Sequence, residues 1–224
     1  MLRKNNPEET KRKLLEVAFG LFLKDGYENV SLQAMHEAAG VSKGALLYHF
    51  RSKEELAEAC MVLQNKLAAE AYKDFFLPDM NGREKLVHLF QKNIESVLDL
   101  DDENGAVRAN SMYRSVTSPQ LLLLFMRHTE DGNIATLFID LIKEGNADGS
   151  LNVKFPEECG KLFLLLYNTW TKPFVFNGGL DLVEKKLKYM QYLFKLQGAD
   201  IIRDELVQNT LLAMQMIYDR LELS

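Results

Sequence analysis

The stretch GVSKGALLYHFRSKEEL at residues 40–56 predicts a tight turn followed by the starts of two helices. Gly40 breaks a short helix that Ser31 caps at its other end. Ser42 then suits the N-cap of a second short helix that runs to about Phe50. Two short helices joined by such a turn have the spacing of a helix-turn-helix motif.

The second helix of this motif, residues 42–50, would place its N-terminal side chains in the major groove of DNA. Leu46 and Phe50 are four residues apart and would anchor the helix to a core, which leaves its polar side chains outside. No acidic residue occurs between Ala38 and Lys53, so nothing on this surface repels phosphate. The alternative is a three-helix packing unit whose lysines are simply solvated.

Helical periodicity extends over almost the whole chain and predicts an all-α fold of about nine or ten helices. The expected helices are 7–26, 31–39, 42–50, 52–76, 82–100, 106–116, 119–145, 156–176, 181–196 and 200–223, with the clearest loop at 146–150. Residues 1–53 are expected to form a three-helix head, and residues 54–224 a larger body. The division falls inside the fourth helix rather than in a linker, so movement of the body would reach the head mechanically.

The 224 residues are 47 % hydrophobic and 26 % charged, the balance of an ordinary soluble globular protein. The net charge is −5, yet residues 1–53 carry nine Lys and Arg against six acidic residues, so a basic head precedes an acidic body. No run of 18 apolar residues occurs, so we expect no membrane span. The first seven residues are basic but no apolar segment follows them, so we expect no secretory signal. The cysteines, Cys60 and Cys159, are expected to be buried and reduced, which favours a cytoplasmic protein.

Two patterns in the head are similar to those of a known family. The 40–56 stretch resembles the signature of the TetR-type transcriptional regulators, and Ala18-(x)3-Phe22-(x)3-Gly26-Tyr27-(x)3-Ser31 resembles that family's first helix and the entry to its second. The resemblance covers about residues 10–60, and beyond them only the length and the number of helices fit. It implies a bacterial regulator, usually a repressor, that reads DNA through the helix at 42–50.

The resemblance also implies which residues contact DNA. Ser31 and Lys53 would hold phosphates at helix N-termini, where backbone N–H groups favour an anion. Lys43 would donate to guanine O6 and N7, while Ala45 and Leu47 would meet a thymine methyl group. The implied DNA-contacting residues are Ser31, Ser42, Lys43, Gly44, Ala45, Leu47, Tyr48, His49 and Lys53.

Two residues of the head depart from the family's pattern. Leu47 stands where a tyrosine is usual, so one phosphate hydrogen bond is absent or comes from Tyr48 instead. His36 stands where a small alanine is usual, in the tight contact between the second and third helices. We expect His36 to be partly buried and structural.

The apolar pattern of the final helix predicts contact with a second copy of the chain. One head touches too little DNA for strong specificity, so we expect a homodimer on palindromic double-stranded operator DNA. The resemblance implies a four-helix interface between the last long helices of two subunits. The stripe expected there is Leu206, Thr210, Ala213, Ile217 and Leu221, with a second apolar face at Leu212, Met216 and Leu223. The alternative is one wider core within a single subunit.

Family members usually sense a small molecule in the body, so the resemblance implies an unknown small-molecule effector. An apolar or amphipathic ligand would suit a cavity lined by Met112, Tyr113, Phe125, Met126, His128, Phe163, Tyr167, Trp170 and Phe174. The aromatic members recur at helical spacing, so plain core packing is the alternative. Arg108, Arg114 and Arg127 are candidates to neutralise an acidic ligand, and nothing in the sequence selects one of them.

No catalytic or metal-binding pattern accompanies these features. The four histidines are scattered, and the sequence has no zinc spacing, HExxH run, glycine-rich phosphate loop or GxSxG elbow. We therefore expect no metal, no cofactor and no enzymatic activity. The predicted function is effector-controlled binding of operator DNA. The alternative is an all-helical ligand-binding or catalytic protein whose helix-turn-helix head no longer reads DNA.

Overall fold

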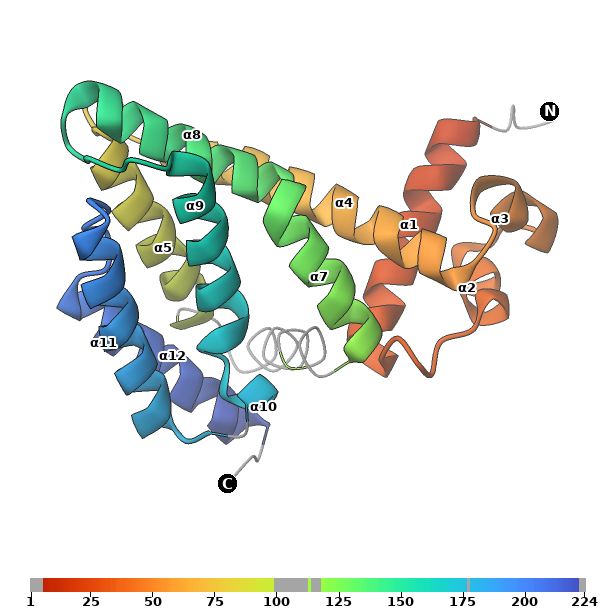
Figure 1. Ribbon diagram of the computed structural model, residues 1–224. Coiled ribbons are helices and arrows are strands. Elements are labelled where there is room, and N and C mark those ends of the chain that lie inside the picture. The colour runs from red at the N-terminus through yellow and green to blue at the C-terminus, as the bar shows by residue number, and fades with distance from the viewer. Residues whose placement is uncertain (1–5, 99–112, 114–117, 177, 222–224) are drawn as a thin grey trace.

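The computed structural model describes residues 6–98, 113, 118–176 and 178–221, and all regular structure in these ranges is helical (Figure 1). The all-α prediction is therefore confirmed. In chain order the elements are α1 (Pro7–Asp25), α2 (Leu32–Ala39), α3 (Lys43–His49), α4 (Lys53–Lys73), α5 (Gly82–Leu98), α7 (Pro119–Asp131), α8 (Asn133–Asp148), α9 (Pro156–Leu165), the π-helical turn η1 (Leu166–Trp170), α10 (Pro173–Phe176), α11 (Leu180–Leu196) and α12 (Asp204–Arg220). None of the described helices is both long enough and apolar enough to cross a membrane.

Serine caps decide where the short helices of the head begin. The hydroxyl oxygens of Ser31, Ser42 and Ser52 each accept a hydrogen bond from the backbone N–H three residues on, at 3.1 Å. These bonds satisfy N–H groups that have no partner inside a helix. The predicted pairing of Ser52 with Glu55 forms, although the Glu55 carboxylate reaches back to the Arg51 N–H, at 2.7 Å.

The core of the head draws on more than the first three helices. It also includes the first turns of α4 and one residue of α7, both of which lie beyond residue 53. The predicted anchors Leu46 and Phe50 belong to this core. Its buried members are Leu14, Leu15, Ala18, Phe22, Tyr27, Val30, Met35, Ala39, Leu46, Phe50, Leu56, Ala57, Cys60 and Leu121.

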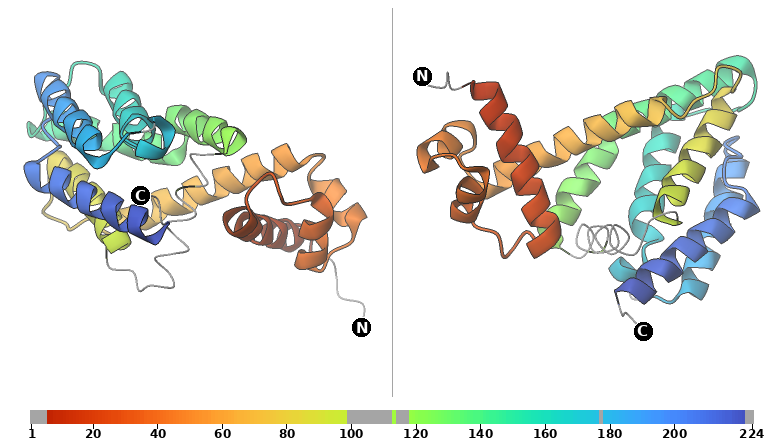
Figure 2. Two further views of the ribbon diagram at one scale, coloured as in Figure 1. Left: turned by 90° about the horizontal axis from the view of Figure 1, so that it is seen from below. Right: turned by 180° about the vertical axis from the view of Figure 1, so that it is seen from behind.

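Helix α4 runs from the head into the body (Figures 1 and 2). Leu56 and Cys60, near its start, are buried in the core of the head, whereas Ala69, near its end, is buried in the core of the body. A second connection is made by the start of α7, where Ser118 Oγ donates to Glu28 Oε1 of the α1–α2 loop at 2.7 Å. Leu121 follows one helical turn later and packs in the head. The head is thus attached to the body at two places.

Aromatic side chains from four helices meet in the core of the body. The ring centroid of Phe163 on α9 lies 4.8 Å from Phe90 on α5 and 5.0 Å from both Phe138 on α8 and Phe194 on α11. Helix α12 packs against α5 and α11 and covers this group. Because Phe163 touches all three other rings, it holds the body together.

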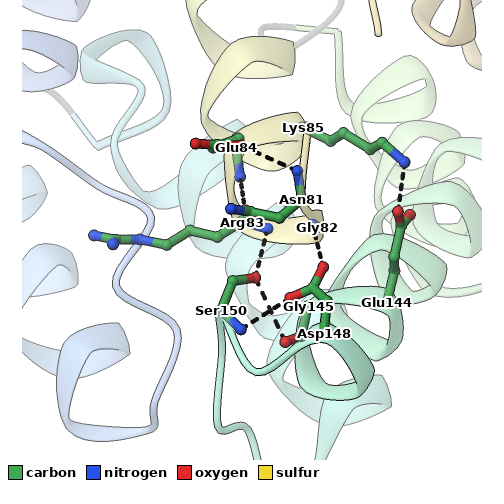
Figure 3. Close-up of polar contacts among 9 residues, drawn as sticks. All are labelled: Asn81, Gly82, Arg83, Glu84, Lys85, Glu144, Gly145, Asp148 and Ser150. Carbon is green, nitrogen blue, oxygen red and sulfur yellow. Dashed lines mark hydrogen bonds and ion pairs between the residues drawn. The ribbon is translucent and has the colours of Figure 1, made fainter. Parts of the chain in front are cut away.

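A polar junction joins the start of α5 to the end of α8 (Figure 3). The Gly82 N–H donates to Asp148 Oδ2 at 2.8 Å, and the Arg83 N–H donates to Ser150 Oγ at 3.2 Å. The Arg83 guanidinium pairs with Asp200 at 2.9 Å and so joins the α11–α12 connection to the same place. The hydrogen bond from Gly82 is the main reason why the pKa of the Asp148 carboxyl is lowered. Three distant parts of the chain therefore meet at one helix N-terminus.

The single helix predicted over 119–145 is wrong, because the chain breaks it at Gly132 into α7 and α8. The Gly132 backbone is extended, and its N–H donates to the His128 carbonyl at 3.0 Å. Asn65 of α4 fills the adjacent space, where its Oδ1 accepts a hydrogen bond from the Ile134 N–H at 3.0 Å. A side chain from a distant helix thus caps α8, and no local signal in 119–145 carries this information.

The helix predicted over 156–176 is also wrong as a continuous element, since η1 and a short break separate α9 from α10. Each turn of a π-helix holds an extra residue, so side chains after Leu165 leave the stripe that α9 begins. Pro173 starts α10, in keeping with the absence of a proline N–H for helix continuation.

Three further predicted boundaries differ from the structure or lie outside it. Helix α8 extends to Asp148, through most of the loop expected at 146–150. Helix α12 begins at Asp204 rather than Asp200, because the intervening Ile201 and Ile202 are buried in the core of the body. The helix predicted over 106–116 lies outside the described residues apart from its helical Tyr113.

The junction between α5 and α8 predicts a strong effect of one added methyl group. A Cβ at Gly82 would lie 2.2 Å from the Gly145 backbone nitrogen and 2.7 Å from the Leu141 carbonyl oxygen. Because neither backbone atom can move aside easily, we expect Gly82→Ala to lower the free energy of unfolding by about 2–3 kcal/mol. Chemical denaturation measures this change.

Gly20 on α1 provides the matched control, since a Cβ there meets nothing within 4 Å. Gly20→Ala should raise the free energy of unfolding by about 0.5–1 kcal/mol, because alanine favours a helix interior. Equal effects of the two substitutions would contradict the close packing at Gly82.

Candidate nucleic-acid interface

The turn between α2 and α3 is fixed by the glycine that the sequence singled out. Gly40 is left-handed (φ 62°, ψ 36°), a conformation that favours glycine. Its N–H donates to the Glu37 carbonyl and the Val41 N–H to the His36 carbonyl, both at 3.0 Å. Carbonyl groups at the end of α2 are thereby satisfied, and α3 can start after a three-residue connection, Gly40–Ser42.

The two faces of α3 differ sharply in exposure. Leu46 is fully buried, whereas its neighbours Leu47 and Tyr48 are 42 % and 79 % exposed. The ring of Tyr48 stands edge-on to that of His49, with centroids 5.0 Å apart. Ser42, Lys43 and Gly44 are exposed at the start of the helix, and Ala45 is partly buried. An exposed aromatic beside a lysine and a bare backbone is suited to contact with a nucleic acid.

The predicted phosphate contacts lie at the N-termini of α2 and α4. Ser31 is exposed, and its oxygen accepts from the Ala34 N–H, so its hydroxyl proton remains available to a phosphate. The Lys53 ammonium lies 4.3 Å from the centroid of the Tyr27 ring and donates to the Glu28 carbonyl at 3.3 Å. Lys53 is therefore held against the α1–α2 loop and not extended into solvent.

Tyr27 itself is a structural residue beneath this lysine. Its hydroxyl donates to Glu54 Oε1 at 3.0 Å. Burial, together with the nearby Glu54 carboxylate, raises the pKa of Tyr27 to about 12. The phenol therefore stays neutral and keeps the N-terminus of α4 next to the α1–α2 loop.

His36 supports the turn from within. It is partly buried, and its Nδ1 lies 3.2 Å from the Val41 carbonyl oxygen. The prediction that His36 is partly buried is confirmed. Between α2 and α3 lies a groove of about 540 Å³, lined by Leu32, Gln33, His36, Glu37, Lys43, Leu46 and Leu47.

The described members of the set predicted to line a body cavity lie in several separate places. Phe163 and Tyr167 are buried in the main core, while Phe125 and His128 line a cavity of only about 30 Å³ between α4, α7, α8 and α9. A cavity of this size holds about one water molecule. Among the described residues His128 Nε2, which is buried there, has no hydrogen-bond partner. Met126 is exposed on α7.

The remaining members gather near the end of α12. The Tyr113 ring lies 5.3 Å from that of Phe174, which lies 5.1 Å from Tyr218. Trp170 is partly buried and packs edge-on to Tyr189 of α11, at 6.0 Å. Met112 lies outside the described residues. The turn at η1 explains the separation, because it directs residues before and after it to different neighbours.

The stripe predicted to form the dimer interface is corrected by the structure. Leu206, Thr210, Ala213 and Ile217 are buried within the subunit itself, and Leu221 packs partly buried against Ile217. This face of α12 therefore belongs to the internal core. On the second predicted face Leu212 is exposed and Met216 is partly exposed, while Leu223 lies outside the described residues.

The exposed apolar residues of α11 were missed from the sequence. Tyr189, Tyr192 and Leu196 are all exposed and lie on one side of the helix, at i, i+3 and i+7. Their spacing is visible in the sequence, but the opposite, buried side of α11 carries an equally regular apolar pattern. Periodicity alone cannot say which of the two sides is internal.

The described residues contain no group of three or more His, Cys, Asp or Glu that could hold a metal ion. Cys60 and Cys159 are buried and free, and burial raises the pKa of their thiols to about 12 and about 11. Both thiols are therefore protonated and unreactive at neutral pH.

Comparison with known proteins agrees with the geometry of the head. Residues 14–60 match the family described as bacterial regulatory proteins, tetR family. This matched segment contains α2, the turn and α3, so the head of the chain carries the TetR-family motif. The TetR match includes the first turns of α4, whose Leu56, Ala57 and Cys60 complete the core of the head.

TetR-family relatives extend the similarity beyond the head. The repressor KstR2 of Mycolicibacterium smegmatis is 26% identical over 148 residues, which cover 65% of this chain and 69% of KstR2. The regulator AcrR of Shigella flexneri and the Tn10 TetC protein of Escherichia coli are both 31% identical, over 96 and 103 residues. These two alignments cover 45% of AcrR and 52% of TetC, so the chain spans about half the length of these relatives.

Solved structures share the TetR fold over nearly the whole chain. Salmonella enterica GusR has a TM-score of 0.55 at 20% identity, over 86% of this chain and 99% of GusR. Reduced Escherichia coli NemR has a TM-score of 0.52 at 16% identity, over 93% and 97% of the two chains. At these identities the similarity concerns the fold alone.

The two faces of α3 predict opposite effects of neighbouring substitutions. Leu46→Ala should lower the free energy of unfolding by about 2–5 kcal/mol, because it opens a cavity in the core of the head. Leu47→Ala removes an exposed side chain and should change it by no more than about 0.5 kcal/mol. Urea denaturation of both variants checks this, and similar losses would mean that α3 is rotated from its position here.

Proposed function

We propose that the chain is a bacterial, cytoplasmic repressor. As a homodimer it binds palindromic operator DNA, and it releases that DNA when a small apolar or amphipathic effector binds the body (residues 54–224). The observation that carries the proposal is the α2–turn–α3 unit. In this unit Lys43 and the 79 % exposed Tyr48 project from a segment, residues 38–53, that contains no acidic residue, while Leu46 fixes the helix to the core. The protein acts by binding and carries out no catalysis.

In this proposal each exposed side chain of α3 has a role in DNA binding. Lys43 at the first turn donates to guanine O6 and N7, and Ala45 and Leu47 meet a thymine methyl group. Tyr48 and His49 contact the DNA backbone beside the groove. Ser31 and Lys53, at the N-termini of α2 and α4, bind phosphates on either side and fix the register of α3 on the duplex. Ser42 and Gly44 let the start of α3 approach the DNA closely.

The outward sides of α11 and α12 form the dimer interface. Tyr189, Tyr192 and Leu196 of α11 and Leu212 of α12 are exposed apolar side chains on two helices that pack together. Large apolar side chains gathered on a surface are typical of a protein–protein interface. Two such pairs of helices would make a four-helix interface and hold two heads for half-sites about one helical turn apart.

Effector binding acts on the head through its two attachments to the body. Helix α4 is shared by both cores, and Ser118 and Leu121 at the start of α7 hold the α1–α2 side of the head. An effector that binds one arrangement of these helices better shifts the population toward it, and the spacing of the two heads then no longer fits successive major grooves. By linkage, operator DNA weakens effector binding by the same factor.

An amphipathic effector is compatible with this fold. Bacillus subtilis FadR, which was solved in complex with stearoyl-CoA, has a TM-score of 0.52 with this chain at 12% identity. A helical body of this kind can therefore hold a long amphipathic molecule. In this chain the aromatic group Tyr113, Phe174 and Tyr218 offers apolar contacts of the same type.

Fluorescence anisotropy on duplexes tiled across the upstream region of the protein's own gene tests DNA binding. We expect saturable binding restricted to a palindrome, with a steep dependence on salt concentration. Lys43→Ala with Tyr48→Ala should weaken it by about a hundredfold, because each direct contact contributes about 1–3 kcal/mol. Circular dichroism should show an unchanged fold, since both side chains are exposed.

Lys154→Ala is the control for loss of a positive charge, because Lys154 is exposed in the loop before α9, far from α3 in the sequence and outside the proposed dimer interface. It should leave DNA affinity unchanged. If the double variant binds the palindrome as tightly as the wild type, α3 is not the reading helix. If neither protein binds any duplex across the genome at low salt, the head no longer reads DNA.

The proposed interface predicts a change of oligomeric state. Leu196→Glu places a charge on α11 at a side chain that is 67 % exposed in the single subunit. We expect light scattering to show a dimer for the wild type and a monomer for this variant, because an unpaired charge is costly in an interface. Leu77→Glu, at an equally exposed position after α4, should remain a dimer. Dimers in both variants would place the interface elsewhere.

A further inference from the structure

Lys172 is a buried cation at the break that follows η1. It is only 7 % exposed, and its ammonium lies 4.9 Å from the centroid of the Tyr167 ring. Among the residues that the structure describes, no carboxylate lies within ion-pair distance of it and no acceptor forms a hydrogen bond with it. Burial of an ammonium without an anion is strongly unfavourable. Burial accordingly lowers the pKa of Lys172 to about 8.

The other polar groups around this break are satisfied. Thr171 Oγ1 donates to the Tyr167 carbonyl at 2.6 Å, and the Tyr167 hydroxyl lies 3.4 Å from Thr210 Oγ1. Thr210 in turn donates to the Leu206 carbonyl at 2.7 Å. Among the described residues around this break, the Lys172 ammonium has a ring contact, with Tyr167, but no ion pair and no hydrogen bond.

A second buried lysine nearby, Lys186, differs from Lys172 because its ammonium has a hydrogen-bond acceptor. Lys186 of α11 is also buried, but its ammonium donates to the Trp170 carbonyl at 2.7 Å and lies 4.7 Å from the Phe176 ring. The Trp170 carbonyl belongs to η1, where the regular helical pattern ends, so Lys186 satisfies an acceptor that the break leaves open. Lys172 satisfies no such acceptor.

The surroundings of Lys172 are apolar on both sides along the chain. Tyr167 belongs to the main core of the body, whereas Phe174 belongs to a separate cluster with Met214, Ile217 and Leu221 of the last helix. Lys172 lies on the segment that passes from one cluster to the other. π-helical turns such as the one just before it occur frequently at functional sites.

We propose that Lys172 is the anion-binding residue of the effector site, and that the effector is a small organic anion whose acidic group pairs with this ammonium and whose apolar part packs on the adjacent aromatic side chains. This inference rests on the proposed function. The proposal names a residue that no sequence pattern marks. Of the three arginines considered from the sequence, Arg127 is exposed, and Arg108 and Arg114 lie outside the described residues.

Two matched pairs of probes test the charge preference on the full chain. 8-Anilinonaphthalene-1-sulfonate and N-phenyl-1-naphthylamine differ by the sulfonate, and dodecanoate and dodecanol differ by the carboxylate. We expect the wild type to bind the anion of at least one pair about tenfold more tightly than its neutral partner, the usual gain from one ionic hydrogen bond. Lys172→Met should abolish that preference without changing affinity for the neutral probe, and Lys172→Arg should retain it.

Thermal unfolding without a probe separates an anion-binding role from a structural one. Lys172→Met should keep or raise the Tm, because it replaces an unpaired buried charge by an apolar chain of similar length. Lys186→Met should lower the Tm, because it leaves the Trp170 carbonyl without its donor. A lower Tm for both variants, or no preference for the anion in either pair, would overturn the proposal.

Operator binding measured in parallel keeps the two proposals distinct. Lys172→Met should bind the palindrome as the wild type does when no effector is present. Loss of the anion preference in Lys172→Met together with absence of DNA binding in both proteins would leave the anion site standing and refute the regulator. If both proteins bind DNA and Lys172→Met keeps the anion preference, the regulator stands and the anion site at Lys172 is refuted.

Discussion

The rest of the structure depends on the burial of one helix in two cores. Helix α4 contributes Leu56 and Cys60 to the head and Ala69 to the body, so neither core is complete without it. A rigid helix of 21 residues is about 30 Å long, and a small rotation at one end moves the other end by several ångströms. Because packed cores resist gradual deformation, such a helix adopts one discrete orientation or another. This constraint links the packing of the body to the position of α3.

The head was predictable because its signals are local. Gly40, Ser31, Ser42 and Ser52 act within a few residues of their own positions, and each occupies in the structure the cap that the sequence assigns to it. The positions of α1–α3 could therefore be read directly. Two details of α3, the exposure of Tyr48 and the burial of Leu46, also follow from helical spacing. What the sequence could not supply is the contribution of Leu121, which comes from far along the chain.

The body was harder to predict because distant contacts decide it. At the break at Gly132 the start of α8 is hydrogen-bonded by Asn65 of a distant helix, and the segment after Pro156 is divided by a π-helical turn, which leaves the hydrophobic pattern almost unchanged. The two apolar sides of the last helices are equally regular, so spacing could not tell the internal side from the outward one. No sequence pattern marks Lys172, because its burial against the Tyr167 ring is visible only in the folded structure.

The place of Leu121 in the core of the head has a consequence for synthesis of the protein. The helix-turn-helix ends near residue 50, yet the core that supports it is closed by a side chain about seventy residues later. A ribosome must therefore translate through α7 before the head can reach its final packing, and the nascent chain until then exposes the apolar surface that Leu121 will cover. The order of folding is thus coupled to the order of translation, and the ability to read DNA emerges only after much of the body has been made.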